Sequence, residues 1–439
     1  MENILKLAAQ KADSAEVVVM RDKETPVFFE RGEINKISKK DTTGVALRLI
    51  KDGRLGFATS TTLDDSRLVE RALATAQFGE RIEIDFPNRE ISEVESYDAY
   101  LASLTEEELI DDAHSIMDRM AAFDPSILVD LYINQTEKEI EIGNSSGFRG
   151  KYNKTNLGIM LSTRSAQGFR EVGSGYSSSR YFTFPEMWLA QLAERHHQAQ
   201  KRQSVPTKKM PVIFSPGTFG TLVTRLLAGI DGTNLNAGTS PLEGKIGKKL
   251  FDDKLSILED PHRTWGIFSC PFDDEGVPTN PKEIIKDGVL QSYLYDLKSA
   301  REAGCESTGN GFKRGFWSSG AGDKPTPTPT NIVIPGGAVP LADMIGKLDE
   351  GILIEGVMGA HTGNINAGEF SLNINPGFYI KDGKISGRAT DAMASGNIYE
   401  TLTNIEAMSS EQGLLAMFGP IGYGPYVLLP EVSVTGKGQ

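Results

Sequence analysis

The sequence predicts an α+β fold made of two strand-rich domains with antiparallel or mixed sheets flanked by helices. Short runs that alternate apolar and polar residues, the period of half-buried strands, recur along the chain. Glycine, at 46 of 439 residues, falls mostly between these runs, where turns need it. A few segments have the apolar period of helices. A basic stretch with a proline, 201–209, divides the chain into predicted domains 1–204 and 205–439.

The first sixty residues are predicted to form strands. Residues 15–20 are mostly apolar, and 46–50 and 55–58 are two further β-like runs. The residues between these two runs, 51–53, are Lys-Asp-Gly, which is a hairpin signal. We therefore expect an antiparallel pair of strands at this point.

Two helices are predicted next, packed on one face of the sheet. Asp64 or Asp65 is expected to cap the first, and Thr105 with Glu108 forms a capping box for the second. The apolar stripe of the first helix is Leu68, Ala72, Leu73 and Ala76. The stripe of the second is Leu109, Ala113, Ile116 and Met120.

Period-two patterning returns after these helices and predicts an antiparallel meander with one covered face. Its runs are 127–133, 137–147 and the stretch around 158–161. A Gly-x-Ser-x-Gly match at 143–147 follows a strand and leads into no helix, so we interpret it as a hairpin turn and not as a nucleophile elbow. A helix is predicted at 185–200, with proline near its first position.

The second half is predicted to begin with a buried strand at 211–214 and a helix that Ser215 caps, with Pro216 in its first turn. Prolines alternate with threonine at 325–329, which is typical of an edge or polyproline-like segment. Further strands, separated by glycine turns, are predicted at 352–356, 378–380 and 426–434.

Composition excludes several classes of protein. The net charge of −13 argues against a direct nucleic-acid surface, which needs clustered Lys and Arg. The two cysteines provide no disulfide framework, and no run of about 18 apolar residues is present to span a membrane. The N-terminus lacks the basic and apolar regions of a signal peptide. We therefore expect a cytoplasmic protein that is not attached to a membrane.

The most specific pattern lies at 271–309. It contains, in order, an acidic loop (273–275), a turn (287–288), a strand-like run (289–295), a short helix-like stretch and a Ser-Thr-Gly loop (307–309). No general rule of strand or helix formation predicts this order, so the order carries information about descent. It resembles the core signature of the TldD/PmbA family, bacterial proteins described as modulators of DNA gyrase and as metallopeptidase-like partners in peptide processing.

The resemblance also allows the family's zinc helix to be examined. Catalytic members of the TldD branch carry His-Glu-x-x-x-His, and a gap-free alignment places this motif over Val223, Thr224 and Ala228. The family's later Cys-Gly falls close to Phe418-Gly419, where this chain has no cysteine. The resemblance therefore implies a member of the PmbA branch, also called TldE. Such a member is expected to bind no metal or other cofactor itself, with zinc only in a TldD-like partner.

Four other residues are candidates for a peptide-binding groove: Asp273, Asp274, Glu275 and His361. The three consecutive carboxylates suit a hard cation, but equally a capping and turn role. His361 lies in a glycine-rich loop that the resemblance places near the subunit's cleft, or is simply a polar turn residue. The adjacent His196 and His197 point about 100° apart on a helix, so we expect a solvated helix end there and no metal site.

Three functions remain open at this point. The first is a non-metal-binding subunit that pairs with a TldD-like metallopeptidase and admits unfolded peptides by strand addition, with a homodimer possible when the chain is alone. The second is an autonomous hydrolase that uses the carboxylates at 273–275 and His361. The third is a non-enzymatic regulatory protein linked to DNA gyrase.

Overall fold

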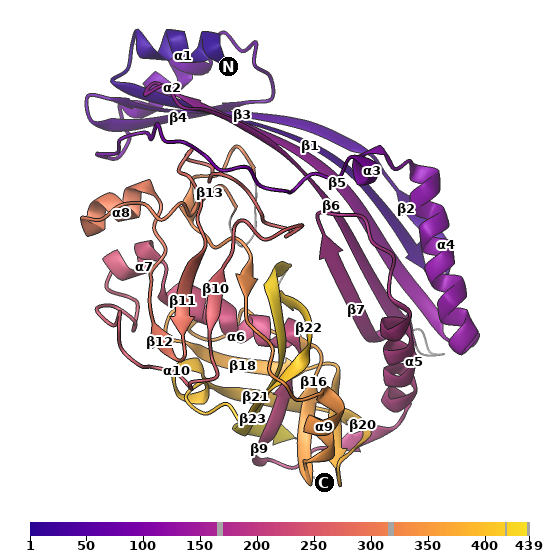
Figure 1. Cartoon of the computed structure of the whole chain (residues 1–439). Helices are drawn as coiled ribbons and strands as arrows, with labels where there is room; N and C mark the ends of the chain where they lie inside the picture. Colours follow the sequence, from indigo (N-terminus) through magenta and orange to yellow (C-terminus); the bar gives the residue numbers. More distant parts are fainter. Residues whose placement is uncertain (165–169, 315–319, 418, 437–439) are drawn as a thin grey trace.

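A computed structural model of the chain describes residues 1–164, 170–314, 320–417 and 419–436. Most of its strands belong to two large sheets with helices packed against them, so the fold is α+β. In Figure 1 the long strands of the first sheet extend over the second sheet, which contains the C-terminal half of the chain. No described helix has the length and apolar character needed to cross a membrane.

The first sheet is antiparallel and has the strand order β4-β3-β1-β5-β6-β7, with β2 paired to β1. Its strands are β1 Ser14–Glu30, β2 Glu33–Ile37, β3 Lys40–Lys51, β4 Arg54–Ser60, β5 Leu128–Asn144, β6 Arg149–Arg164 and β7 Arg170–Ser178. The predicted β3–β4 hairpin is confirmed, and its turn residues Asp52 and Gly53 both have positive φ. The separate runs predicted at 127–133 and 137–147 are instead one strand, because β5 stays paired with β6 throughout.

Helices pack on one face of the first sheet, one pair of helices near each end of β1. Helices α1 Glu2–Ala9 and α2 Leu68–Ala76 pack near Val17, while α3 Ala99–Ser103 and α4 Glu106–Phe123 pack near Phe29. The capping box of Thr105 at the start of α4 is confirmed. The predicted cap of α2 is wrong: its N-cap is Arg67, and Asp65, two residues earlier, accepts the amide of Arg67.

The second sheet is mixed and has fourteen described strands. They are β8 Arg202–Ser204, β9 Lys208–Phe214, β10 Ile257–Glu259, β11 Lys282–Lys286, β12 Val289–Leu290, β15 Ile332–Val333, β16 Glu350–Ile354, β17 Val357–Met358, β18 Glu369–Ile374, β19 Gly377–Lys381, β20 Lys384–Thr390, β21 Ala392–Asn397, β22 Ala407–Ala416 and β23 Pro420–Gly436. The strand expected at 289–295 ends at Leu290, because only Val289 and Leu290 pair with β11. The predicted domain boundary at 204/205 falls directly after β8.

The proline-bearing segment forms a separate small pair of strands, β13 Gly311–Phe312 with β14 Thr326–Pro327. The remaining helices are α5 Glu186–Gln200, α6 Pro216–Gly229, α7 Gly232–Asn236, α8 Leu297–Ala303, α9 Leu341–Gly346 and α10 Ile398–Thr401. The first of them, α5, begins after Pro185, which is its N-cap. Its Leu189 and Leu192 pack in one hydrophobic cluster with strands of both sheets, so α5 joins the two halves.

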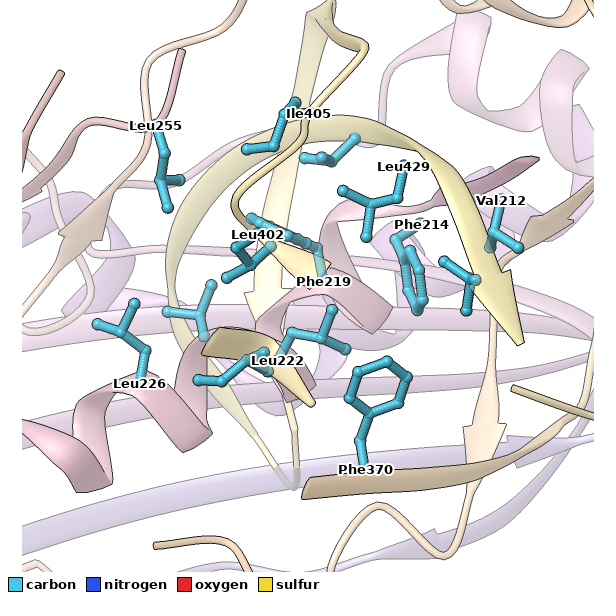
Figure 2. Packing of buried hydrophobic residues seen from close by; sticks show 14 of the residues in the cluster. Val212, Phe214, Phe219, Leu222, Leu226, Leu255, Phe370, Leu402, Ile405 and Leu429 are labelled. Atoms are coloured by element: carbon cyan, nitrogen blue, oxygen red, sulfur yellow. The ribbon is translucent and has the colours of Figure 1, made fainter. Parts of the chain in front are cut away.

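Helix α6 lies in the largest hydrophobic cluster of the second half (Figure 2). As predicted, Ser215 caps it by accepting the Thr218 amide at 3.4 Å, and Pro216 begins the helix. Phe219, Leu222 and Leu226 of α6 are buried together with side chains of β9, β18 and β23. This packing fixes the helix on which the family's zinc motif would lie.

Candidate functional site

The zinc-motif positions on α6 present no metal-binding atoms. Val223 is 1% exposed and belongs to the hydrophobic core, and Thr224 donates its hydroxyl to the carbonyl of Gly220 at 2.9 Å. Ala228 provides only a methyl group. Zinc needs nitrogen, sulfur or carboxylate ligands, so these three side chains do not fit the metal that catalytic relatives bind through this motif. Phe418, near the family's cysteine position, lies outside the described residues.

The backbone of α6 lies very close to β22 at Gly220, three residues before the first aligned motif position, Val223. A Cβ atom added to Gly220 would lie 2.3 Å from the amide nitrogen of Ala416, so a larger residue would push the helix and strand apart. Helix α6 and β22 are therefore closely packed against each other.

Arg225 occupies the interior of the motif, and sequence analysis did not identify it. Its side chain is fully buried and donates four hydrogen bonds to main-chain carbonyls. The acceptors are Thr221 at 2.9 Å, Ala360 at 2.9 Å, Thr362 at 3.1 Å and Glu369 at 2.6 Å. Burial lowers the pKa of Arg225 to about 10, so the guanidinium stays charged near neutral pH.

These bonds attach the glycine-rich loop of His361 to α6. Two of the acceptors, Ala360 and Thr362, flank His361, whose side chain is exposed. Thr362 also donates its hydroxyl to the carbonyls of Gly359 and Ser371, which closes the loop on itself. The structure thus presents His361 at the surface, on a loop fixed from beneath. Arg225 is the only charged residue of α6, and this was the sequence signal that would have indicated the anchor.

The acidic loop at 273–275 is buried, and its oxygens are occupied by groups of this chain. Asp273 accepts the amides of Glu275, Val277 and Gly311, and Asp274 accepts the amide of Lys313 at 2.7 Å. Burial raises the pKa of both aspartates above their usual value. These hydrogen bonds match the capping and turn interpretation. The three carboxylates have almost no exposed surface with which to line a groove.

Glu275 connects the two halves of the molecule. One of its oxygens accepts Arg48 of β3 at 2.6 Å, and the other accepts the amide of Leu297 at the start of α8. Arg48 also pairs with Glu16 of β1 at 3.2 Å and lies over the ring of Phe86. All three charged side chains are buried, so the acidic loop is a structural joint between the sheets.

The structure corrects the expectation for His196. It is buried, and its Nδ1 lies 2.9 Å from the hydroxyl of Thr163 on β6, because α5 packs this side of its last turn against the first sheet. Burial lowers the pKa of His196. His197 is exposed, 3.5 Å from Asp124, as expected for a solvated helix end. In the described parts of the chain, no three His, Cys, Asp or Glu side chains come together in a metal-binding arrangement.

Two cavities lie elsewhere on the surface. One, of about 540 Å³, lies beside α7 and α8 and is lined by residues that include Glu243, Tyr293, Tyr295 and Glu302. The other, of about 340 Å³, lies between β7 with α5 on one side and β22 with β23 on the other. None of the predicted site residues lines either cavity.

Comparison with known proteins defines the class to which this architecture belongs. Models described as PmbA/TldA metallopeptidase domain 1, central domain and C-terminal domain match residues 15–76, 99–196 and 207–436 in that order. The protein is thus a homologue of metallopeptidases built from these consecutive domains. Because the third match alone covers more than half of the chain, the chain belongs to the PmbA/TldD family, as the segment 271–309 indicated.

Individual relatives match nearly the whole chain. Metalloprotease PmbA of Escherichia coli O157:H7 is 26% identical over 447 residues, which covers 99% of this chain and 94% of that protein. The crystal structure of TldE from Thermococcus kodakarensis has a TM-score of 0.91 at 24% identity and covers 99% of this chain and 100% of that one. A structure from Thermotoga maritima MSB8, named as a modulator of a DNA gyrase, has a TM-score of 0.86 at 24% identity, with 99% of both chains covered.

Proposed function

We propose that this chain is the PmbA/TldE-type subunit of a TldD/TldE-type peptidase complex and binds no catalytic zinc itself. The observation that carries the proposal is the chemistry of α6, where Val223, Thr224 and Ala228 stand at the zinc-motif positions. Arg225 supports it, because a buried cation that fixes the neighbouring loop would repel a second cation placed beside it.

In this proposal a TldD-like metallopeptidase subunit supplies the zinc and the cleavage step. The present chain contributes binding surface for an unfolded peptide in the cytoplasm. Strand β7 lies at the end of the first sheet, and β22 pairs only with β23 among the described strands, with Val339 bridged to its Ser409. Strand β7 and the part of β22 after Ser410 offer edges to which an extended peptide adds by main-chain hydrogen bonds. The exposed loop of His361 and the segment at 325–329 remain proposed groove elements.

The geometry gives the two alternative functions less support. An autonomous hydrolase would need the carboxylates at 273–275 to reach substrate, yet Asp273 and Glu275 have no exposed surface. A purely regulatory protein linked to gyrase draws support only from the name of the Thermotoga maritima structure.

Zinc analysis combined with size measurement tests the proposal. The chain is purified alone and co-expressed with a TldD-like metallopeptidase, and zinc is measured by elemental analysis in both samples. We expect no stoichiometric zinc and no peptidase activity in the chain alone, where it runs as a monomer or homodimer, and a stable, active, zinc-containing hetero-complex. Stoichiometric zinc in the chain alone, lost together with activity on chelation, would refute the assignment.

A further inference from the structure

The cavity between β7 and β22 is rich in aromatic rings. Tyr176 of β7 contacts Phe182 edge-on at 5.0 Å and Trp188 of α5 at 5.1 Å between ring centroids. Across the cavity, Tyr423 of β23 forms the opposite wall, with Gln412 of β22 beside it. Tyr176, Phe182 and Trp188 are only half-buried, so their faces are available to an apolar group of a ligand.

One positive charge lies in this aromatic cavity. The guanidinium of Arg263 lies over the ring of Tyr423, 4.5 Å from its centroid, which is a cation–π contact. Among the described residues, no carboxylate pairs with Arg263, and the side chain is half-buried. In a chain with a net charge of −13, where most buried arginines have acidic partners, an unpaired arginine in a cavity indicates an anionic ligand.

The surroundings identify the kind of anion. The cavity volume of about 340 Å³ accommodates one large side chain with a carboxylate, at the lower end of ligand-site sizes. Strands β7 and β22 lie side by side (Figure 1), and residues of both line the cavity. Strand β7 ends the first sheet, and β22 after Ser410 pairs only with β23 among the described strands. Main-chain groups of an extended peptide pair with such edges. A peptide that ends in this cavity would bring its last side chain to the rings and its free carboxylate to Arg263.

We propose that this cavity binds the C-terminal carboxylate of an extended peptide, with Arg263 as the carboxylate partner and Tyr176 and Trp188 as the walls around the last side chain. The proposal rests on the proposed function only in taking the ligand to be a peptide. It assigns this chain a preference for free C-termini, which would orient a substrate within the complex.

The test uses the purified chain and three fluorescein-labelled probes, two of the sequence Gly-Ser-Gly-Phe and one of the sequence Gly-Glu-Gly-Phe. One probe has a free C-terminal carboxylate, the second has a C-terminal amide, and the third has the amide and an internal glutamate. Fluorescence polarisation measures binding of each probe. We expect the free acid to bind at least about tenfold more tightly than either amide, the size of effect that one charged hydrogen-bonded pair produces.

Arg263→Gln should reduce binding of the free acid to the level of the amide, while Arg263→Lys should retain part of the preference. Arg67→Gln is the matched control, because Arg67 is an exposed arginine at the start of α2 with no ion pair among the described residues. It should leave all three affinities unchanged. Circular dichroism checks that each variant is folded.

Equal binding of acid and amide would overturn the proposal, as would an Arg263→Gln variant that keeps the preference. Binding of the glutamate probe as tightly as the free acid would also overturn it, by assigning the cavity to side-chain carboxylates. These outcomes are independent of zinc content and of complex formation. If the acid preference holds but no hetero-complex forms, the proposed function fails and the cavity assignment stands.

Discussion

Replacing Arg225 with methionine tests whether this side chain fixes the loop of His361 to α6. Methionine keeps a long unbranched side chain in the core but removes all four hydrogen bonds. Each hydrogen bond from a charged donor contributes about 1.5–3 kcal/mol, so the sum over the four bonds is the upper limit of the loss in the free energy of unfolding.

Two effects make the expected loss of unfolding free energy smaller than this upper limit. The loop is at the surface, so the carbonyls of Ala360, Thr362 and Glu369 regain water when the loop moves away. The variant also avoids the cost of burying a cation that has no carboxylate partner in the described structure. We therefore expect the free energy of unfolding to fall by roughly 2–4 kcal/mol.

Urea unfolding measures this free energy, and hydrogen exchange of residues 359–369 measures the local effect. The amides of Thr362 and Glu369, which form turns within the loop, should exchange faster in Arg225→Met. Thr224→Val is the matched control, because it removes one hydrogen bond at the next position of the same helix. If Arg225→Met costs no more than Thr224→Val and loop exchange is unchanged, the anchoring role is wrong.

Two further predictions concern the buried charges. Arg48→Met removes the cation that pairs with the buried Glu16 and Glu275, so urea unfolding should show that the free energy of unfolding falls by about 3–5 kcal/mol. A fall of less than about 1 kcal/mol would contradict the role of these ion pairs in joining the two sheets. Burial raises the pKa of Asp296 from 3.8 to about 6, so the folded state binds its proton more tightly than the unfolded state. The protonated carboxyl of Asp296 therefore contributes about 1–3 kcal/mol to the free energy of unfolding. This contribution is fully present below about pH 3.8 and is lost as the pH rises through about 6. Asp296→Asn, which keeps a side-chain oxygen for the Ser299 amide, should remove this loss; unfolding curves with the same pH dependence as the wild type would contradict it.

Features set by neighbouring residues were predictable from sequence. The capping box of Thr105, the turn at Asp52-Gly53 and the proline start of α6 depend on a few adjacent side chains, and each is confirmed. The resemblance of 271–309 identified the family for a related reason, since the order of its local elements is itself a sequence property.

Features set by distant residues were not predictable. The continuity of β5 depends on pairing with β6, and the burial of His196 depends on Thr163 of that strand. The carboxylates at 273–275 were candidates for a groove because a sequence shows their charge but not the backbone amides that surround them. The role of Arg225 depends on carbonyls more than 130 residues further along the chain.

The bond between Arg48 and Glu275 joins residues 227 positions apart. During synthesis Arg48 leaves the ribosome long before Glu275 does. Glu16, which precedes Arg48 in the chain, is available to pair with it from the start. The N-terminal sheet can therefore bury this arginine without waiting for the rest of the protein. A fragment that starts after residue 204 would lose this partner sheet, so the apolar surface that packs against it, including Phe272, would face water. Separate expression of that half should accordingly yield insoluble material, although family models recognise it as a domain.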